Sequence, residues 1–554
     1  MRELETLMEA EHSSPWARTT TRVFAGQLAQ IAESFYAHGD ELATETARHM
    51  GVTPTSVWLE VIFPSVWGFL SMYSFLKSME EIPLSNLTAV EPTPADMLLD
   101  VPALKLLPAN IFQSLILPDF SGYVLLRTPR DEGSVRILEK GLALCLLPFN
   151  LASIGALDIL QLLAHGPMRV VAKLSEKVTF LRPHFERIFS PLLLTKALVF
   201  VEGGPEVGSW LAGRSEFDRI HLTGSGRTAA AVQELVGVEK LTCELGGVTP
   251  AIILPEVFQN DHLLYQAARQ VAFGALANNG QHCVSYQVVM VPESQQVTFR
   301  KALALEMGLT VSTGASQLMR TLVDESAAAR VGEMVEDARR LGALVNPDAC
   351  DPQGRQFPVT LLNGITDQMR LFREEVFGPV VGIMSLPDHE FADQAVLKAN
   401  QPALFGDLGA SLFTSQPESS LVHKLAGQLK HGVVGINSYP GVAFATSLPW
   451  GAGPGKVSGR GWVHNYQFLA ESFLQKVVLS APLGRKGPRP FVWEDPWLPN
   501  VSGPSTLRFA RSLVRSTLAF FKKQPLRLLA SQSTMIPTLL FRELTSRRQD
   551  LALG

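Results

Sequence analysis

The chain shows two kinds of hydrophobic spacing. Residues 23–50 place apolar side chains three or four positions apart with polar residues between them. This spacing predicts a helix, a break at the His-Gly-Asp of residues 38–40, and a second helix. Residues 82–115 contain more proline and no regular spacing, so irregular structure is expected there.

From about residue 140, short apolar runs alternate with amphipathic stretches. This order predicts parallel strands joined by crossover helices, and therefore an α/β fold. One alternating block precedes Glu244 and a second follows it. The expected strands cover residues 141–149, 169–174, 197–204, 218–225, 251–255 and 285–293, and the expected helices 152–166, 184–197, 227–237, 262–276 and 327–343.

Two uncharged apolar segments, residues 61–76 and 141–157, raise the question of a membrane span. Both are shorter than the ~20 residues that a spanning helix needs, and each contains a proline, so buried elements are expected instead. The first twelve residues are acidic and lack the apolar core of a secretory signal.

The bulk composition limits the class of protein. A chain of 554 residues is long enough for two or three domains, and a net charge of −4 gives no reason to expect a nucleic-acid partner. The cysteines are far apart, which argues against a disulfide framework or a zinc site and favours a reducing, cytoplasmic location. They are Cys145, Cys243, Cys283 and Cys350.

The C-terminal part differs in charge from the rest. Residues 485–554 contain 12 Lys and Arg against 4 Asp and Glu, a net of +8, so residues 1–484 carry −12. Within them, residues 505–523 predict a basic amphipathic helix. Docking on the acidic body is favoured, and peripheral contact with an anionic membrane surface is the alternative. Its apolar stripe is Leu507, Ala510, Val514, Leu518 and Phe521, and its basic stripe Arg508, Arg511, Arg515 and Lys522.

Several short motifs, each weak alone, occur in a particular order. They are LLPFN ending in Asn150, AKLSE with Lys173 and Glu176, GGPEVG from Gly203, TGSG with Gly224 and Ser225, CELGG with Glu244, NNGQHC with Cys283, EEVFGP with Glu375 and Phe377, and the Gly-rich PWGAGPGKVSGRG. Taken together, in this order and with these gaps, the chain resembles the aldehyde dehydrogenase superfamily over roughly residues 20–482. The N-x-G-Q-x-C and E-E-x-F-G-P elements are the most specific.

The resemblance implies a catalytic set. Cys283 corresponds to the nucleophile, whose thiolate adds to a carbonyl and later leaves from a thioester. Asn150 and the backbone N–H of Cys283 correspond to the oxyanion donors, and Glu244 to the base that activates water. The implied reaction oxidises an aldehyde to a carboxylic acid through a thiohemiacetal and a thioester.

The resemblance also implies a nicotinamide cofactor and no metal. Lys173 and Glu176 correspond to the pair at the adenosine ribose, where a carboxylate favours NAD over the alternative, NADP. Gly224 and Ser225 would lie by the pyrophosphate. Glu375 would bond the nicotinamide ribose, and Phe377 would pack beside the nicotinamide.

Some positions depart from the family pattern. Phe149 replaces a Trp, Leu174 a Pro and Val248 a Lys, and the Gly-rich motif is longer than usual, so the chain is expected to be a divergent member. His282 is interpreted as a spacer rather than a base for the thiol. A hydrophobic aldehyde is expected from the residues around the presumed tunnel, Leu151, Ile154, Tyr439, Val442 and Phe444.

The resemblance implies a Rossmann-like coenzyme-binding domain over 1–245, interrupted by a small β oligomerisation arm at about 118–136. A second α/β catalytic domain follows over 246–464. A return strand of the arm lies within 465–484, and a basic extension covers 485–554. A homodimer or homotetramer is expected. Two rival functions stay open: a CoA-acylating aldehyde dehydrogenase, and a catalytically silent scaffold that has kept the fold.

Overall fold

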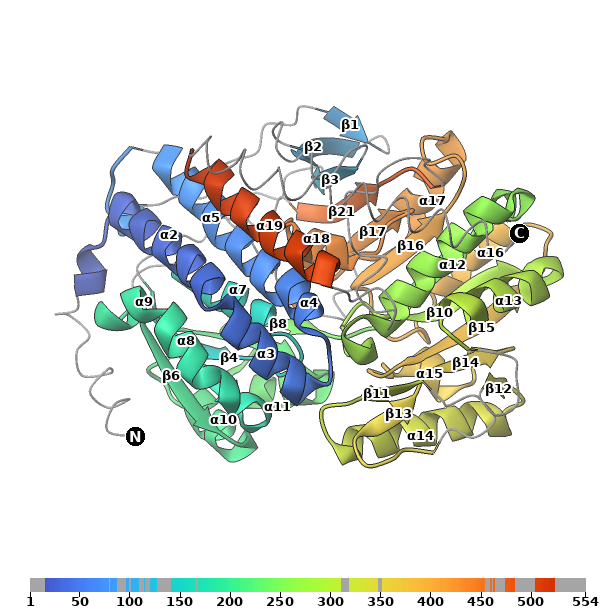
Figure 1. Cartoon of the computed structure of the whole chain (residues 1–554), viewed down its shortest axis with the longest axis horizontal. Coiled ribbons are helices and arrows are strands. Elements are labelled where there is room, and N and C mark those ends of the chain that lie inside the picture. Colours follow the sequence, from blue (N-terminus) through green and yellow to red (C-terminus); the bar gives the residue numbers. More distant parts are fainter. Residues whose placement is uncertain are drawn as a thin grey trace.

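Two β-sheets with helices packed around them organise the chain, which confirms the expected α/β class (Figure 1). The structure is a computed structural model. It describes residues 15–78, 80–86, 96–98, 101–108, 114, 120–126, 141–164, 168–309, 318–346, 351–453, 459–460, 462–463, 474–483 and 504–523.

The first sheet has the Rossmann-like order that the sequence predicts. From the central strand β4 the chain runs outward to β5 and β6, and then returns to β7 and β8 on the other side. These five strands are parallel, so their carboxyl ends share one edge, and the reversal at β4 opens a crevice there. Within the described residues the strands are β4 (Leu142–Leu146), β5 (Arg169–Ser175), β6 (Leu198–Gly203), β7 (Arg219–Gly224), β8 (Leu241–Leu245) and the antiparallel edge strand β19 (Gly459–Arg460).

The second sheet is larger and mixed. Its middle strands are parallel, and β3, β2 and β1 extend it by antiparallel pairing beyond β21. In the order of the sheet, the described strands are β1 (Asp96–Leu98), β2 (Val101–Leu107), β3 (Ser121–Leu126), β21 (Leu474–Ser480), β17 (Val433–Ile436), β16 (Gly409–Phe413), β9 (Thr249–Ile253), β10 (Tyr286–Pro292), β15 (Val380–Leu386), β14 (Thr360–Asn363) and β12 (Leu344–Asn346). The small pairs are β11 (Met319–Thr321) with β13 (Gln356–Pro358), and β18 (Trp450–Gly451) with β20 (Trp462–Val463).

Two expectations about elements are wrong. Strands β1 and β2 lie in a region expected to be irregular, because pairing with β3 fixes a sequence whose own pattern is weak. The helix expected over 184–197 is two helices, α8 (Arg182–Ile188) and α9 (Ser190–Leu194), since Pro191 cannot continue the first one.

The helices otherwise follow the predicted spacing, and the break at residues 38–40 separates α2 from α3. The remaining helices in the described residues are α2 (Thr21–Ala37), α3 (Gly39–Met50), α4 (Pro54–Val57), α5 (Phe63–Ser78), α7 (Ala152–Ala164), α10 (Pro205–Ala212), α11 (Gly226–Val236), α12 (Asp261–Leu276), α13 (Gln296–Glu306), α14 (Glu325–Arg340), α15 (Arg370–Arg373), α16 (Phe391–Ala399), α17 (Ser420–Gln428), α18 (Gly441–Ala445) and α19 (Pro504–Phe521). A π-helix, η2 (Trp58–Ile62), separates α4 from α5. The 3-10 turns are η1 (Pro15–Arg18), η3 (Leu84–Asn86), η4 (Glu176–Leu181), η5 (Pro255–Gln259), η6 (Ala277–Gly280) and η7 (Glu293–Gln295).

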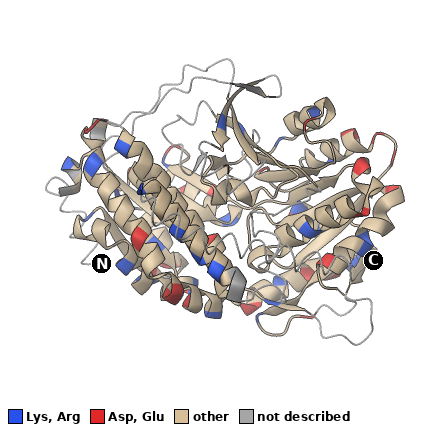
Figure 2. Cartoon of the chain, turned by 45° about the horizontal axis from the view of Figure 1, so that its top comes forward, with Lys and Arg blue, Asp and Glu red and all other residues tan. Residues whose placement is uncertain are grey.

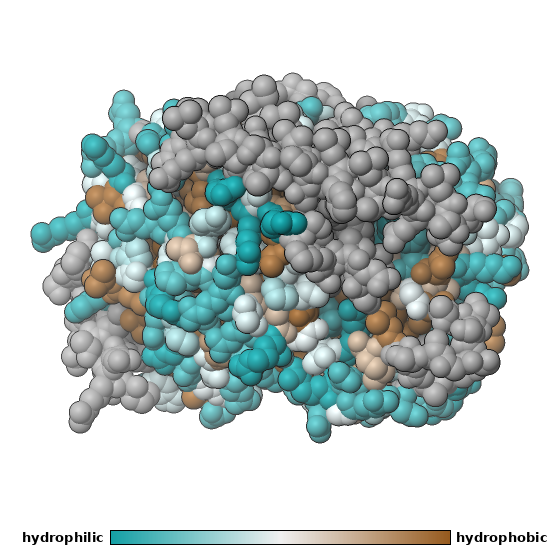
Figure 3. Space-filling model, in the orientation of Figure 1, coloured by the Kyte–Doolittle hydropathy of each residue, from teal (hydrophilic) through white to brown (hydrophobic). Residues whose placement is uncertain are grey.

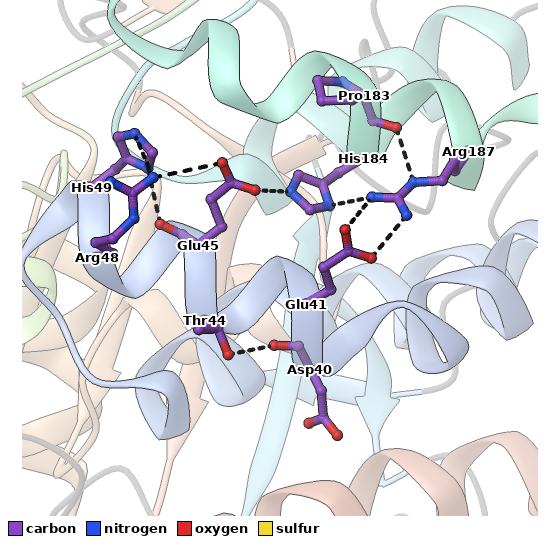
Figure 4. Close-up of polar contacts among 9 residues, drawn as sticks. All are labelled: Asp40, Glu41, Thr44, Glu45, Arg48, His49, Pro183, His184 and Arg187. Atoms are coloured by element: carbon purple, nitrogen blue, oxygen red, sulfur yellow. Dashed lines mark hydrogen bonds and ion pairs between the residues drawn. The ribbon is translucent and has the colours of Figure 1, made fainter.

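A polar network joins the N-terminal helices to the first sheet (Figure 4). His184 on α8 is almost fully buried, and its Nε2 lies 2.6 Å from Glu45 Oε2 on α3. One turn further along α8, Arg187 donates two hydrogen bonds of 2.7 and 2.8 Å to the Glu41 carboxylate. These contacts fix α3 on the helices that cover β6, and so hold the N-terminal layer beside the crevice.

The N-terminal layer also contains a long apolar helix. Residues 54–78 form, within the described chain, one continuous helix that is long and apolar enough to cross a membrane, but 78% of its most apolar window is buried inside the protein. In Figure 2 most of the strands inside the molecule are tan, and many of the charged residues lie on the surrounding helices. Residues 61–76 are therefore a buried helix, and 141–157 are strand β4, a turn and the start of α7, as the sequence predicts.

Helix α19, from the basic C-terminal part, lies along α5 and α2 (Figure 1). Its apolar stripe faces them: Ala510 and Val514 are fully buried, and Leu518 is nearly so. Its basic residues contact acidic side chains of the body, with Arg511 Nη2 lying 2.6 Å from Asp40 Oδ1 and Lys522 paired with Glu33. The part of the basic extension that the structure describes thus docks on the acidic body, which was the favoured interpretation.

Candidate active site

The loop before β10 that carries Cys283 has an unusual backbone. Asn278, Asn279 and Gly280 all have left-handed φ angles, of 46°, 60° and 75°. Asparagine tolerates this region better than most residues do, and glycine adopts it without strain. A Cβ at Gly280 would also overlap the carbonyl of Gly378. The Asn-Asn-Gly run therefore shapes a tight turn that leads directly into the nucleophile position.

The polar side chains of this loop are paired with backbone groups. Asn278 Nδ2 donates to Asn150 O at 3.0 Å, and Asn279 Nδ2 donates to Met50 O at 3.0 Å. Gln281 Oε1 accepts a hydrogen bond of 2.9 Å from Val323 N. The polar residues that precede Cys283 thus anchor the loop to three separate segments, and they also explain why a buried turn can be polar.

Cys283 and Asn150 lie together at one cavity. The Asn150 amide is positioned by a hydrogen bond of 3.1 Å from its Nδ2 to Gln281 O, two residues before the thiol. Burial raises the pKa of the Cys283 thiol well above its usual value, and the carboxylates of Glu244 and Glu375 raise it further. The two carboxyl groups and the thiol are therefore electrostatically coupled, although they come from distant parts of the sequence.

Glu244 ends strand β8 and is 4% exposed. Its Oε2 accepts a hydrogen bond of 2.7 Å from Trp450 Nε1, and its Oε1 is buried with no hydrogen-bond partner. Burial, aided by Asp158, raises the pKa of the Glu244 carboxyl well above 4.5. A buried carboxyl with a free oxygen and a raised pKa is suited to taking and returning a proton.

Glu375 is fixed from both sides. The Gln287 side chain accepts a bond of 2.7 Å from Val376 N and donates one of 2.7 Å to Glu374 O, which pins the Glu-Glu-Val segment to β10. The Glu375 carboxylate accepts from Gly247 N and occupies the space beside Gly246, where a Cβ would overlap it. Its Oε1 is buried without a partner, and burial raises the pKa of the carboxyl to about 8.

The carboxyl ends of β5 and β6 bring charged groups together. Lys173 is 9% exposed, and burial lowers the pKa of its ammonium while Glu176 and Glu206 counteract this. A Cβ at Gly204 would lie 2.5 Å from Glu206 Oε2 and 2.9 Å from Glu176 Oε2, so both carboxylates converge over that glycine. Lys173 and Glu176 are residues that the sequence analysis identifies, whereas it does not identify Glu206 as the second carboxylate over Gly204.

Gly224 and Ser225 lie where β7 meets α11, and both are exposed. Ser225 caps the helix, accepting a bond of 3.2 Å from Thr228 N. Phe377, with a φ of 52°, packs edge-to-face on Phe149 at 6.0 Å between ring centroids. The exposed N-terminus of α11 can bind phosphate groups, and the unpartnered Glu375 oxygen can accept a hydrogen bond from a ribose hydroxyl. These groups fit a dinucleotide.

The cavity at Cys283 is lined mostly by apolar side chains. Leu151, Ile154, Tyr439 and Phe444 line it as expected, whereas Val442 is buried but is not among its lining residues. His282 also lines it, with its ring nitrogens facing Tyr439 and Glu60. Glu60, on the π-helix η2, lines it too and was missed by the sequence analysis, because it lies far from every motif.

The other cysteines are as expected where they can be seen. Cys145 and Cys243 are buried, and Cys350 lies outside the described residues. Among the described residues, no group of three His, Cys, Asp or Glu side chains could hold a metal ion.

The aldehyde dehydrogenase family profile matches residues 122–478. Retinaldehyde dehydrogenase 3 of Mus musculus is 28% identical over 293 residues, which are 51% of this chain and 54% of the relative. The NADP-dependent succinate-semialdehyde dehydrogenase of Deinococcus radiodurans is 32% identical over 274 residues, or 48% and 54% of the two chains. The chain thus spans about half the length of the curated relatives it matches.

Solved structures share the fold over much more of the chain. The crystal structure of an NAD-dependent aldehyde dehydrogenase from Sinorhizobium meliloti superposes with a TM-score of 0.64 at 21% identity, covering 88% of this chain and 87% of that one. That of the Mycobacterium tuberculosis aldehyde dehydrogenase complexed with NAD+ gives 0.64 at 21% identity and covers 87% and 90%. The matched residues include β4 to β21, and with them both sheets and the nucleophile loop, so the chain belongs to the aldehyde dehydrogenase family.

Proposed function

We propose that the protein oxidises an aldehyde to a carboxylic acid with NAD or NADP as the hydride acceptor. The observation that carries this proposal is the grouping of the Cys283 thiol, the Asn150 amide and the Trp450 indole at one cavity, with the buried Glu244 carboxyl accepting a hydrogen bond from that indole. The family match and the shared fold support it.

The first half of the reaction uses Cys283 and Asn150. The thiol loses its proton, and the thiolate sulfur adds to the aldehyde carbon, which turns the carbonyl oxygen into an oxyanion. The Asn150 amide and the backbone N–H of Cys283 would stabilise that oxyanion. A bound nicotinamide supplies the hydride acceptor, and loss of the hydride leaves the acyl group on Cys283 as a thioester.

The second half uses Glu244. Its carboxylate takes a proton from a water molecule, the hydroxyl attacks the thioester carbon, and the Cys283 thiolate leaves with release of the acid. The Trp450 N–H holds one carboxyl oxygen, which leaves Oε1 for the water. This base argues against the CoA-acylating alternative, in which CoA rather than water takes the acyl group.

The residues fit a nicotinamide dinucleotide along the crevice of the first sheet. Lys173 and Glu176 would hold the adenosine ribose, Gly224 and Ser225 the pyrophosphate, and Glu375 the nicotinamide ribose beside Phe377. Two carboxylates converge over Gly204, at the adenosine end. A 2′-phosphate would be repelled there, so NAD is the proposed cofactor.

The test is NADH formation from a panel of aldehydes, with and without CoA. We expect turnover without CoA, loss of turnover in Cys283→Ser, and a burst of about one NADH per subunit followed by arrest in Glu244→Gln, because that variant still acylates. A CoA requirement would favour the acylating alternative, and no turnover in protein shown to bind NAD would favour the silent scaffold.

The domain boundaries given above and assembly into a homodimer or homotetramer also stay proposals. Much of the expected arm, residues 118–119 and 127–136, lies outside the described residues. The described part of this arm is strand β3, which pairs with β21 in the second sheet. Sedimentation of the full chain would measure the oligomer size directly.

A further inference from the structure

Besides Asn150 and Cys283, three polar side chains line the mostly apolar cavity and lie next to one another. His282 Nδ1 is 3.0 Å from the Tyr439 hydroxyl, and His282 Nε2 is 3.5 Å from Glu60 Oε2. All three side chains line the cavity with Cys283. They come from the π-helix η2, the nucleophile loop and the turn after β17, so the fold brings together residues that no motif connects.

Glu60 is the unusual member of this trio. It is 6% exposed, and its Oε1 is buried without a hydrogen-bond partner. Burial raises the pKa of its carboxyl. Leaving a buried carboxyl oxygen unpaired is costly, and such groups often mark a place where a ligand supplies the missing partner.

The backbone around Glu60 is also specialised. The wide π turn ends where Phe63 N donates to Trp58 O, five residues earlier, and π turns within helices are frequent at functional sites. The Glu60 carbonyl accepts a hydrogen bond of 2.7 Å from Ser153 Oγ on α7, which fixes the turn against the helix that follows Asn150. This local irregularity carries Glu60, which is the acidic side chain among the described residues that line the cavity.

We propose that Glu60, His282 and Tyr439 form a polar subsite that binds a hydroxyl group on the aldehyde substrate. This inference rests on the proposed function, since it names the class of aldehyde that the same cavity takes. It narrows the earlier expectation of a purely hydrophobic aldehyde to one with an apolar chain and a hydroxyl.

A hydroxyl suits the trio better than a charged group does. It is neutral, and it can donate to Glu60 Oε1 while accepting from a neighbouring N–H or O–H. An ammonium group can only donate, and it would have to leave water for a cavity whose other walls are apolar, among them Ile154, Phe273 and Phe444.

The test compares alkanals of increasing length with hydroxyalkanals of the same length and with the matching aminoalkanals. In the wild-type protein we expect kcat/KM for the best hydroxyalkanal to exceed that of its alkanal by about tenfold or more. Glu60→Leu should bring this ratio of kcat/KM values to about one. Glu60→Gln, which keeps the side-chain volume and an acceptor oxygen, should retain most of the preference for the hydroxyalkanal. Ile154→Val, which changes an apolar lining residue, should change kcat/KM for the alkanal and for the hydroxyalkanal by the same factor.

A second readout does not depend on turnover. Alkylation of Cys283 by iodoacetamide is followed by mass spectrometry in the presence of a diol or the matching mono-alcohol. In the wild-type protein the diol should protect Cys283 from alkylation at a lower concentration than the mono-alcohol does. In Glu60→Leu the two compounds should protect Cys283 at equal concentrations.

The two failures are distinguishable. Protection by the diol without any aldehyde oxidation would overturn the proposed function and support the subsite. Oxidation of alkanals and hydroxyalkanals with equal kcat/KM, or a preference for the aminoalkanal that Glu60→Gln removes, would overturn the subsite and leave the proposed function standing.

Discussion

Glu375 links the chemistry of the site to the stability of the protein. Its carboxyl has a pKa of about 8 in the folded protein, against 4.5 for an ordinary Glu, because it is buried. As the pH rises from about 4.5 to about 8, the unfolded chain loses this proton before the folded protein does, so stability falls. We expect the melting temperature of Glu375→Gln to fall less than that of the wild type between about pH 5 and about pH 8.

The neighbouring Glu374 provides the control. Its hydrogen bond with Arg370 lowers the pKa of the Glu374 carboxyl, so that group is already ionised in both states over the same pH window. Glu374→Gln should therefore leave the pH dependence of the melting temperature unchanged. Parallel curves for wild type and Glu375→Gln would show that the Glu375 carboxyl is not held protonated by burial.

The carboxylates over Gly204 predict the cofactor preference. Removing one negative charge near a 2′-phosphate is worth about 1 kcal/mol in a solvated site, or about fivefold. We expect Glu176→Gln and Glu206→Gln each to raise the ratio of kcat/KM for NADP to that for NAD by about this factor. Glu202→Gln, on the same edge but 3.5 Å from Arg182, is the matched control and should not change the ratio.

How far the sequence predicts the site depends on where each residue lies. Asn150, Glu244 and Cys283 sit in short motifs whose order is informative; Asn150 and Cys283 line one cavity, and Glu244 is bonded to Trp450, which lines it too. Glu60 lies outside every motif, and Glu206 lies within GGPEVG, but its approach to Glu176 over Gly204 is visible only in the fold. The contacts of His282 could not be predicted either, since its partners Tyr439 and Glu60 are remote in sequence.

At the scale of elements, hydrophobic periodicity identified the long helices but not the irregular ones. The break between α2 and α3 follows from the local sequence, and Gly39 there leaves room for the Trp58 ring, which a Cβ would overlap. The π turn at Trp58–Ile62 has no such signature, because the surrounding run is apolar on every side. Strands β1 and β2 depend on pairing with β3, which no local pattern predicts.

Helix α19 is predicted to stabilise the N-terminal layer rather than bind membranes. Leu513 is 2% exposed and packs in the hydrophobic core with α5 and α2, so Leu513→Ala should cost about 2–5 kcal/mol of unfolding free energy. Arg508→Ala, on the exposed side of the same helix, should change it by no more than about 0.5 kcal/mol. Denaturant unfolding measures both values.

The membrane alternative has a separate measurement. Flotation with anionic liposomes should be equal for the full chain and for the chain ending near Pro482, because the apolar stripe of α19 is already covered. The face shown in Figure 3 agrees with this, since its described residues are mainly hydrophilic with small separate hydrophobic groups. Flotation that depends on residues beyond Pro482 would instead favour peripheral membrane contact.

At the scale of the whole molecule, the two sheets should respond as a unit to the complete dinucleotide. The proposed adenosine and pyrophosphate contacts are all on the first sheet, whereas Glu375 lies just before β15 of the second. NAD would reach both sheets, and ADP, which lacks the second ribose, would reach only the first.

Hydrogen exchange resolves this difference, because amide protection reports local opening in each part of the fold. We expect NAD to slow exchange both near residues 223–228 and in the segment 374–379, and ADP to slow it only in the former. In Glu375→Gln, NAD should keep the first effect and lose most of the second, because Glu375 is the residue of this segment proposed to bond the nicotinamide ribose, whereas Gln287 and Arg330 hold the segment with or without the cofactor. If NAD slows exchange only in residues 223–228 of the wild type, the nicotinamide end lies away from Glu375. If ADP slows exchange equally in both segments, the two sheets are coupled through the protein itself rather than through the cofactor.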